Sequence, residues 1–448
     1  MDATSLGSEL SRVRMDGLIV DRGHAEYNKY RRIWNGLADR QPAAIIRARS
    51  VDDVKKTIRI AVDQGALLAV RCGGHSLPGL STCDDGIVLD LSLMNDVAVD
   101  AASGIAEVGG GALLGDLDAA GAQVGLVTPA GVVSHTGVAG LTLGGGMGWL
   151  SRRFGLTIDN LLGAELVTAD GRLIWASADS EPDLFWGLRG GGGNFGVVTK
   201  FKFQMHAFDP IVVISSWTYD PKDCETVLDG YQRLSADARH ELTTSFSFYS
   251  AGLVVTACWS GSSSEAEPVL APFGKLAKVI SGSLGKMAYV DHQRRHDEAM
   301  AWGQRHYSKG GFLEKIDAVA IACMSDAIAK TPTAKSDIYV LQLGGAISDV
   351  AEGATAYSGR EANYYWIASA TWDESSDDLR CMAWGREAAK NLAAISLKGN
   401  YVNEQADFGN DVAVSAYGAE KYIKLARLKA TYDPGNLFRL NQNIEPKL

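Results

Sequence analysis

Two glycine-dense segments constrain this chain more than any other feature of its sequence. The first, residues 71–76, places a pair of glycines and His75 at the end of a predicted strand, and the second, residues 128–146, ends in three successive glycines. Successive glycines cost backbone entropy on folding, so they indicate a place where the backbone must approach something closely. Their unhindered amides can surround an anion. Each segment alone could be a turn or a packed corner, but together with His75 they favour a phosphate-containing cofactor with a reactive ring.

The composition narrows the class of protein. The 448 residues, 46% hydrophobic and 21% charged, are typical of a globular protein with more than one domain. A net charge of −10 argues against general binding to nucleic acids, which requires clustered lysine and arginine. No apolar run approaches the roughly 20 residues that span a bilayer, so we expect no membrane segment.

The N-terminal residues and the cysteines both bear on the location of the protein in the cell. Residues 1–9 lack the basic and apolar blocks of a secretory signal. The six cysteines are scattered and form no CxxC pair, which favours reduced thiols over a disulfide or zinc framework. We therefore expect a cytoplasmic protein with no metal site.

The first 205 or so residues alternate predicted helices and strands. Ser50 and Asp53 form a capping-box pattern, and apolar residues then recur at helical spacing until Gly65. Short strands are predicted at residues 66–70, 87–91, 105–108, 163–168 and 197–205, and a second helix at residues 112–123. This alternation indicates an α/β region.

From about residue 210 the sequence is richer in β-branched and aromatic residues and poorer in glycine. Strands are predicted at residues 211–219, 242–249, 253–259, 338–343 and 364–372. Helices are predicted at residues 223–236, 264–278 and 375–392, and another begins near residue 420. Strands with helices between them suggest an antiparallel sheet backed by helices on one face.

Several ordered motifs give the chain a family resemblance. They are the Arg-x-Gly-Gly-His-Ser segment at residues 71–76, residues 86–91, residues 137–148, residues 153–160, residues 183–199 and residues 432–443. In this order they resemble the flavin-binding domain of the vanillyl-alcohol oxidase superfamily, and within it the berberine-bridge-enzyme-like oxidoreductases. The bacterial branch typified by 6-hydroxy-D-nicotine oxidase is the most similar.

The resemblance implies an FAD enzyme of the α+β class. A two-lobed, flavin-binding α/β domain of vanillyl-alcohol oxidase type is expected from residues 1–208, and a substrate domain with the antiparallel sheet and its helices from residues 209–400. Residues 401–448 are expected to return to the FAD-binding domain. The substrate would then lie between the middle domain and the flavin.

The family's cofactor contacts carry over to the matching positions of this chain. The implied FAD-binding residues are Arg71, Gly73, Gly74, His75, Ser76, Pro129, Gly131, Ser134, His135, Thr136, Gly137, Gly140, Leu141, Gly145, Val198, Asn441 and Asn443. The resemblance further implies a covalent bond from His75 to the 8α-methyl carbon of the flavin, which is chemically reasonable because a neutral imidazole is a nucleophile. Relatives with a second link have a cysteine where Val133 stands, so a single linkage is expected. Many relatives also carry a tyrosine where this chain has Leu77.

Three residues are expected to take part in catalysis. Tyr401 and Asn403 match a Tyr-x-Asn segment that crosses the flavin face in the family, although an ordinary interdomain strand would show the same pattern. In a strand, alternation would place Tyr401 and Asn403 on one face and Glu404 on the other, so Glu404 is expected to point away from the site. Tyr307 is the third candidate, from a run at residues 305–309 that resembles the family's substrate domain. A lone tyrosine in a sheet is more often structural.

The leading functional interpretation is an oxidase of a small alcohol, amine or phenolic, alkaloid-like compound, in secondary metabolism or catabolism. Hydride would pass to flavin N5 and the electrons then to O2. The alternatives are a flavin dehydrogenase with another acceptor and a flavin-binding protein without catalysis. Thr136 stands where relatives control oxygen access, and it favours neither acceptor. A nicotinamide-dependent reductase is disfavoured, because no Gly-x-Gly-x-x-Gly fingerprint follows the first strand. Expected partners are small molecules only, bound by a monomer or homodimer.

Overall fold

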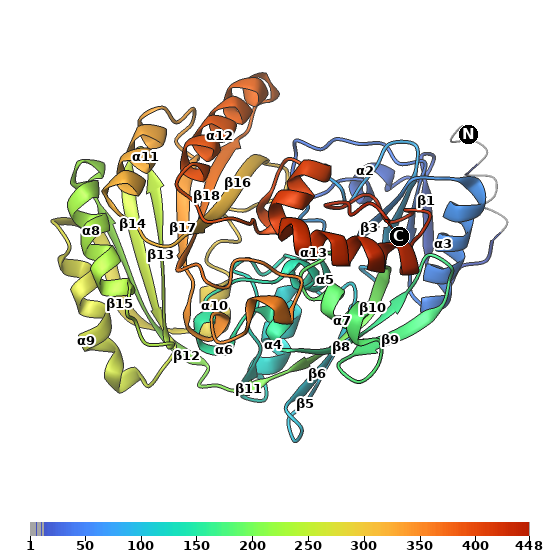
Figure 1. The fold of residues 1–448 in the computed structure, drawn as a ribbon, viewed down its shortest axis with the longest axis horizontal. Helices are drawn as coiled ribbons and strands as arrows, with labels where there is room; N and C mark the ends of the chain where they lie inside the picture. The colour runs from blue at the N-terminus through green and yellow to red at the C-terminus, as the bar shows by residue number, and fades with distance from the viewer. Residues whose placement is uncertain (1–5, 7–9, 11–12, 448) are drawn as a thin grey trace.

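Two lobes face each other in the computed structural model, which describes residues 6, 10 and 13–447 (Figure 1). One lobe is built on residues 18–204 and the other on residues 211–372. The mixture of helices and sheets confirms the α+β class. Most of residues 1–9, which we interpret as lacking a secretory signal, lie outside the described residues. Within the described part of the chain, no helix combines the length and the apolar character that crossing a bilayer requires.

A four-stranded sheet begins the first lobe. Its order is β1 (Leu18–Asp21), β2 (Ala44–Arg47), β4 (Ile87–Asp90) and β3 (Leu68–Arg71), and all but β1 are parallel. Helix α3 (Val51–Gln64) packs on this sheet, while the short helix α2 (Tyr27–Tyr30) follows β1. As predicted, the Ser50 hydroxyl accepts a hydrogen bond from the amide of Asp53 at 3.3 Å, and Gly65 ends the helix with a φ of 60°. Since β3 and β4 are parallel, the first glycine segment leaves the sheet at their shared carboxyl edge.

A five-stranded antiparallel sheet completes the first lobe. Its order is β5 (Val97–Asp100), β6 (Ile105–Gly109), β10 (Val197–Gln204), β8 (Leu161–Val167) and β9 (Leu173–Ser177). A hairpin turn near residue 170 joins β8 to β9. The other elements of this lobe are α4 (Leu114–Ala122), β7 (Leu126–Val127), α5 (Val138–Gly144), α6 (Ser151–Phe154), α7 (Pro182–Leu188) and β11 (His206–Ala207).

The second lobe is a seven-stranded antiparallel sheet. Its order is β15 (Val279–Ala288), β12 (Ile211–Tyr219), β14 (Gly252–Trp259), β13 (Leu242–Tyr249), β17 (Asp337–Gln342), β18 (Tyr364–Trp372) and β16 (Arg305–Leu313). Helices α8 (Cys224–Ser235), α9 (Ala266–Leu270), α11 (Ala318–Ala329) and α12 (Asp378–Ala393) cover the face turned away from the first lobe (Figure 1). The short α10 (Tyr289–Gln293) follows β15. One sheet face therefore packs on helices, and the other is left to face the first lobe.

Several elements of the second lobe and the tail differ from the prediction. The helix expected at residues 264–278 ends at Leu270 and continues as a 3-10 turn, because Pro272 lacks the amide that an α-helix needs. The structure adds β15 and β16, whose glycines and serines hid their strand character. Helix α13 (Asn410–Tyr432) begins ten residues before the expected residue 420 and is kinked at Gly418.

The chain's tail packs on the first lobe. Helix α13 lies beside α7 in the same hydrophobic core, and it spans the front of this lobe in Figure 1. The ammonium of Lys429 is buried, lies 2.7 Å from Asp433, and donates to the carbonyls of Asn194 and Phe438. Because a buried charge is costly without such partners, these contacts fix the tail in one position.

Candidate active site

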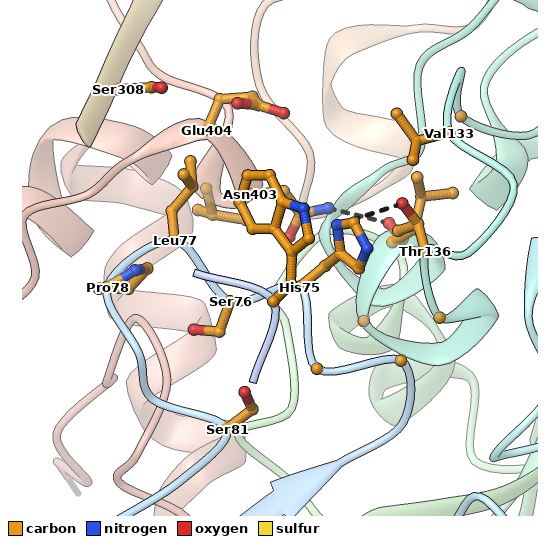
Figure 2. A pocket seen from close by; sticks show the side chains of 18 of the residues that line it. His75, Ser76, Leu77, Pro78, Ser81, Val133, Thr136, Ser308, Asn403 and Glu404 are labelled. Atoms are coloured by element: carbon orange, nitrogen blue, oxygen red, sulfur yellow. Dashed lines mark hydrogen bonds between the residues drawn. The ribbon is translucent and has the colours of Figure 1, made fainter. Parts of the chain in front are cut away.

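A cavity of about 680 Å³ lies between the two lobes. Its lining comes from both glycine segments of the first lobe, from the free face of the seven-stranded sheet, and from the tail. Figure 2 shows its centre, with His75, Ser76 and Ser81 from the first lobe, Ser308 from β16, and Glu404 from the tail. Concave sites that join two lobes in this way are where small molecules and cofactors usually bind.

The first glycine loop presents unused backbone donors. Gly74 has a φ of +69°, a conformation that strongly favours glycine. Within the described residues, the amides of Gly74, His75 and Ser76 donate to no backbone carbonyl. Successive free amides in a turn form a concave nest that binds an anion. The loop therefore fits a phosphate group.

The two glycine loops touch through their backbones. A Cβ added to Gly73 would lie 2.3 Å from the amide nitrogen of Gly137, and one added to Gly137 would lie 2.4 Å from that of Gly73. By contrast, a Cβ added to Gly140 or Gly193 would meet no atom within 4 Å, although both residues line the cavity. Gly73 and Gly137 thus allow the two loops to pack together, while Gly140 and Gly193 leave open space beside the backbone.

Unpaired polar atoms mark the same region. Ser81 Oγ, Asn441 Oδ1 and Gln442 Oε1 are buried without a hydrogen-bond partner among the described residues, and all three residues line the cavity. An unsatisfied buried polar group costs about 1–3 kcal/mol, so such atoms indicate a ligand that supplies the missing partners. The free amides, the open glycine faces and these orphaned acceptors fit FAD, which carries phosphates, hydroxyls and a ring N–H.

His75 lies at the meeting point of the two loops. Its Nδ1 is 3.5 Å from Oγ1 of Thr136 (Figure 2). Its Nε2 is 2.6 Å from Nδ1 of His135, and its ring stacks on that of Trp34 with centroids 4.8 Å apart. Burial, followed by the neighbouring His135 and His306, lowers the pKa of His75 to about 3. The imidazole is therefore neutral near pH 7 and keeps a lone pair for bonding.

Most of the predicted cofactor residues line the cavity. Those that do are Gly73, Gly74, His75, Ser76, Gly131, Thr136, Gly137, Gly140, Leu141, Val198 and Asn441. Those that do not are Arg71, Pro129, Ser134, His135, Gly145 and Asn443.

The residues outside the cavity have structural roles that explain their positions. Arg71 forms a buried ion pair with Asp90 at 2.5 Å, so it joins the ends of β3 and β4. Both the amide and the hydroxyl of Ser134 donate to Asp297, at 2.9 and 2.5 Å. Gly145, at a φ of +139°, is pressed against the ring of Tyr357. These residues shape the loops from behind and do not face the cavity.

The expected strand at residues 401–404 is instead a 3-10 turn over Val402–Glu404. Alternation does not apply to a turn, so Tyr401, Asn403 and Glu404 all line the cavity, and the prediction that Glu404 points away was wrong. The Asn403 amide donates to the Tyr401 hydroxyl at 2.9 Å and to the Leu141 carbonyl at 3.0 Å. The bond to Leu141 connects the tail to the second glycine loop.

Glu404 is the least satisfied carboxyl in the cavity. None of the described residues forms a hydrogen bond or ion pair with its side chain, and burial raises its pKa to about 7. Tyr339 and Tyr365 also line the cavity, and their buried hydroxyls have no hydrogen-bond partner among the described residues. Burial, followed by the Glu404 charge, raises the pKa of Tyr365. A carboxyl that titrates near pH 7 is well suited to accept a proton from a substrate.

Tyr307 does not belong to the site. Its neighbours His306 and Ser308 on β16 line the cavity, but the Tyr307 ring points to the opposite face of the strand, into the helix-covered core. Its hydroxyl donates to Asp407 at 2.9 Å. The expectation that Tyr307 acts in catalysis therefore fails on geometry.

The sequence interpretation missed the wall formed by the sheet. Polar side chains at alternate positions of three strands line the cavity, namely Ser247, Tyr249, Asp337, Tyr339, Ser369 and Thr371. Burial raises the pKa of Asp337 to about 7, and hydrogen bonds with Ser247 and Tyr249 oppose that rise. The signal was present, because polar residues at every second position of a strand mark a face that does not pack on helices.

The chain matches two family models, one for an FAD-binding domain over residues 42–177 and one described as berberine and berberine like over residues 400–445. It is 32% identical to (R)-6-hydroxynicotine oxidase of Paenarthrobacter nicotinovorans, over 97% of each chain. An FAD-linked oxidoreductase of Dictyostelium discoideum is also 32% identical, over 96% of this chain and 95% of that protein. The chain belongs to the berberine-bridge-enzyme-like FAD-linked oxidoreductases.

Solved structures of this family share the fold. The crystal structure of 6-hydroxy-D-nicotine oxidase from Arthrobacter nicotinovorans superposes with a TM-score of 0.88 at 28% identity, covering 97% of this chain and 99% of that one. A berberine-bridge-enzyme-like protein of Physcomitrella patens gives 0.90 at 23% identity, covering 99% of each chain. The family and the fold were both predicted from the ordered motifs, and both are confirmed.

Proposed function

We propose that this FAD-dependent oxidoreductase is an oxidase of a small organic alcohol or amine, including phenolic and alkaloid-like compounds, with O2 as its acceptor. The observation that carries the proposal is that one cavity holds both His75, the candidate FAD anchor, and Glu404, a candidate base. Relatives named as oxidases, such as (R)-6-hydroxynicotine oxidase, support this acceptor. The role belongs to secondary metabolism or catabolism.

We assign different roles to the cavity residues of the tail and to those of the seven-stranded sheet. When bound, FAD supplies an acceptor for hydride from a substrate carbon. Glu404 accepts the proton of the substrate's hydroxyl or amino group, and the hydroxyls of Tyr339 and Tyr365 orient that group. Asn403 and Tyr401 hold the turn that carries Glu404.

We further propose that FAD is attached through His75 alone. The position of a second linkage is occupied by Val133, which lines the cavity and cannot form a thioether (Figure 2). Cys72 also lines the cavity, but burial raises the pKa of its thiol to about 11, so it stays protonated and unreactive.

The domain division follows from the same scheme. We infer that residues 1–208 and 401–448 form the FAD-binding domain and residues 209–400 the substrate domain. Packing of α13 on the first lobe supports this division. We also propose a cytoplasmic location, which the six free thiols support.

The proposed linkage is tested by acid precipitation of the purified protein. The pellet should stay yellow, and its mass should exceed the chain mass by that of one FAD. In the His75→Ala variant the pellet should be colourless, with flavin in the supernatant. A yellow pellet from this variant would assign the link to another residue.

The proposed reaction is tested with a panel of alcohols, amines and phenols. At least one compound should bleach the flavin without oxygen, and air should restore the colour within seconds. Slow recovery in air would make the enzyme a dehydrogenase with another acceptor, and the absence of bleaching by any compound would favour a non-catalytic flavin protein.

A further inference from the structure

The two nitrogens of His75 have different surroundings. Nε2 lies at hydrogen-bond distance, 2.6 Å, from Nδ1 of His135. Nδ1 has only a long contact within the described residues, 3.5 Å to Oγ1 of Thr136, drawn as a dashed line in Figure 2. When Nε2 carries the ring's proton and donates it to His135, the lone pair of Nδ1 is free to bond to carbon.

Trp34 fixes the plane of this imidazole. The indole stacks on His75 with ring centroids 4.8 Å apart and planes 13° apart, and it stacks equally flat on His306 at 4.2 Å. The indole itself is held in place, because its Nε1 donates to the carbonyl of Met300 at 2.7 Å. Trp34 and His306 both lie outside the loop of His75. Other parts of the chain therefore impose the orientation of the His75 ring.

His135 is placed to pass a proton outward. Its side chain is partly exposed but does not line the cavity. The flanking residues are anchored, since Ser134 donates to Asp297 and the carbonyl of Thr136 accepts from the amide of Leu114 at 2.9 Å. A proton received from His75 therefore has a route to solvent that avoids the cavity.

We propose that His135 accepts the Nε2 proton of His75 while the histidyl–FAD bond forms, and that Trp34 holds the imidazole in the plane this bond requires. Both act through His75 as positioning residues, and the proposal rests on the covalent link proposed above. The N–C bond forms at Nδ1, a C–H bond of the flavin 8α carbon breaks, and the Nε2–H bond of His75 breaks. Dioxygen takes up the two electrons and both protons and becomes hydrogen peroxide.

Without His135, the alkylated imidazole would keep a proton on Nε2 and carry a positive charge inside a site that already disfavours it. Burial and two neighbouring histidines lower the pKa of His75, and each of these influences opposes an imidazolium at this position. Removal of the proton as the bond forms avoids that charge.

The experiment follows linkage in the full chain, produced under riboflavin limitation and then mixed with FAD in air. The covalent fraction is measured over time by colour and mass of the acid-precipitated protein. His135→Asn is the decisive variant, because its amide oxygen can accept the hydrogen bond from His75 but cannot take the proton. Linkage should slow by about 100-fold or more in this variant, the scale of a lost general base. In His135→Ala, added imidazole should restore part of the rate.

The stacking of Trp34 on His75 is tested by a matched pair of variants. Trp34→Phe keeps an aromatic face and should link at close to the wild-type rate, while Trp34→Leu should link about tenfold more slowly because the ring is free to tilt. His240→Ala, which removes an exposed histidine elsewhere, should leave the rate unchanged. Non-covalent FAD binding, read from flavin fluorescence, confirms that each variant is folded.

The outcomes separate the two proposals. A colourless wild-type pellet would remove the covalent link and this inference with it, although substrate bleaching would still test the oxidoreductase. A yellow wild-type pellet together with unslowed linkage in His135→Asn would overturn only the inference, because a hydrogen bond alone would then suffice. A His135→Ala rate that imidazole does not raise would also count against proton transfer.

Discussion

The two walls of the cavity are built on different principles. The first-lobe wall is rich in glycines, which touch at Gly73 and Gly137 and leave open space at Gly140. The sheet wall is made of side chains such as Tyr249, Asp337 and Tyr339 that project from regular strands. Where two glycine backbones touch, no side chain can be added, while an exposed strand face accepts almost any side chain. We therefore expect the touching glycines of the first-lobe wall to tolerate little substitution, and the sheet wall to be free to change its chemistry.

The largest effect should come from adding a side chain where the two glycine loops touch. In Gly73→Ala the new Cβ would lie 2.3 Å from the amide nitrogen of Gly137, a clash that only backbone movement can relieve. We expect a loss of about 4 kcal/mol or more in unfolding free energy and loss of bound FAD. Denaturant unfolding and flavin absorbance measure both. Gly353→Ala, where a Cβ meets nothing within 4 Å, is the control; equal stability of the two variants would contradict the backbone account.

Removal of the candidate base should affect turnover but not the cofactor. Glu404→Gln should lower kcat by about 10²- to 10⁴-fold, the range for a lost general base, with full FAD content. In the wild type, kcat should rise with pH through about 7, because Glu404 must be ionised to accept a proton and burial raises its pKa to about 7. Steady-state kinetics across pH measures both effects, and exposed Glu361→Gln is the control. A variant that keeps wild-type kcat would remove Glu404 from the mechanism.

Two buried carboxyls of the cavity should also make stability depend on pH. Burial raises the pKa of Glu404 and of Asp337 to about 7, from usual values of 4.5 and 3.8. At these two groups the folded state binds more protons than the unfolded state, so their contribution to the unfolding free energy should fall as pH rises from about 4 to 7. Histidines such as His75, whose pKa burial lowers to about 3, contribute in the opposite sense. Thermal melts of the FAD-free protein isolate the carboxyls as the stability difference between the wild type and the double variant Glu404→Gln, Asp337→Asn, and that difference should change across this pH range. A difference that stays constant with pH would remove this role from the two carboxyls.

The smallest effect is expected on the helix-covered side of the sheet. Tyr307→Phe removes one hydrogen bond, to Asp407, and should cost about 1 kcal/mol of stability while kcat changes less than about twofold. Thermal melts and steady-state kinetics are the measurements. A tenfold loss of kcat with normal stability would return Tyr307 to the active site.

Features that are set by residues close together in the sequence could be predicted from it, and features that depend on tertiary packing could not. Ser50 and Gly65 bound a helix through contacts within a few residues, so their roles followed from the sequence alone. Glu404 was misplaced because alternation assumes a strand, and the turn at residues 402–404 occurs where the chain crosses between lobes. Tyr307 was misplaced because only the tertiary fold decides which face of β16 receives helices.

The predicted cofactor residues divide in two by position. Some, such as Gly74, His75 and Asn441, line the cavity. Others, such as Arg71 and Ser134, belong to the same motifs but support the loops from behind. A motif therefore identifies a segment that a ligand needs, without distinguishing the residues that touch the ligand from those that shape the segment.

The position of the tail has a consequence for how the protein matures. Asn441 and Gln442 line the cavity together with His75, although the whole second lobe separates them from His75 in the sequence. N-terminal segments fold while synthesis continues, so the first lobe can form before Asn441 and Gln442 reach it. We therefore expect the flavin pocket to be completed only after the second lobe has been synthesised.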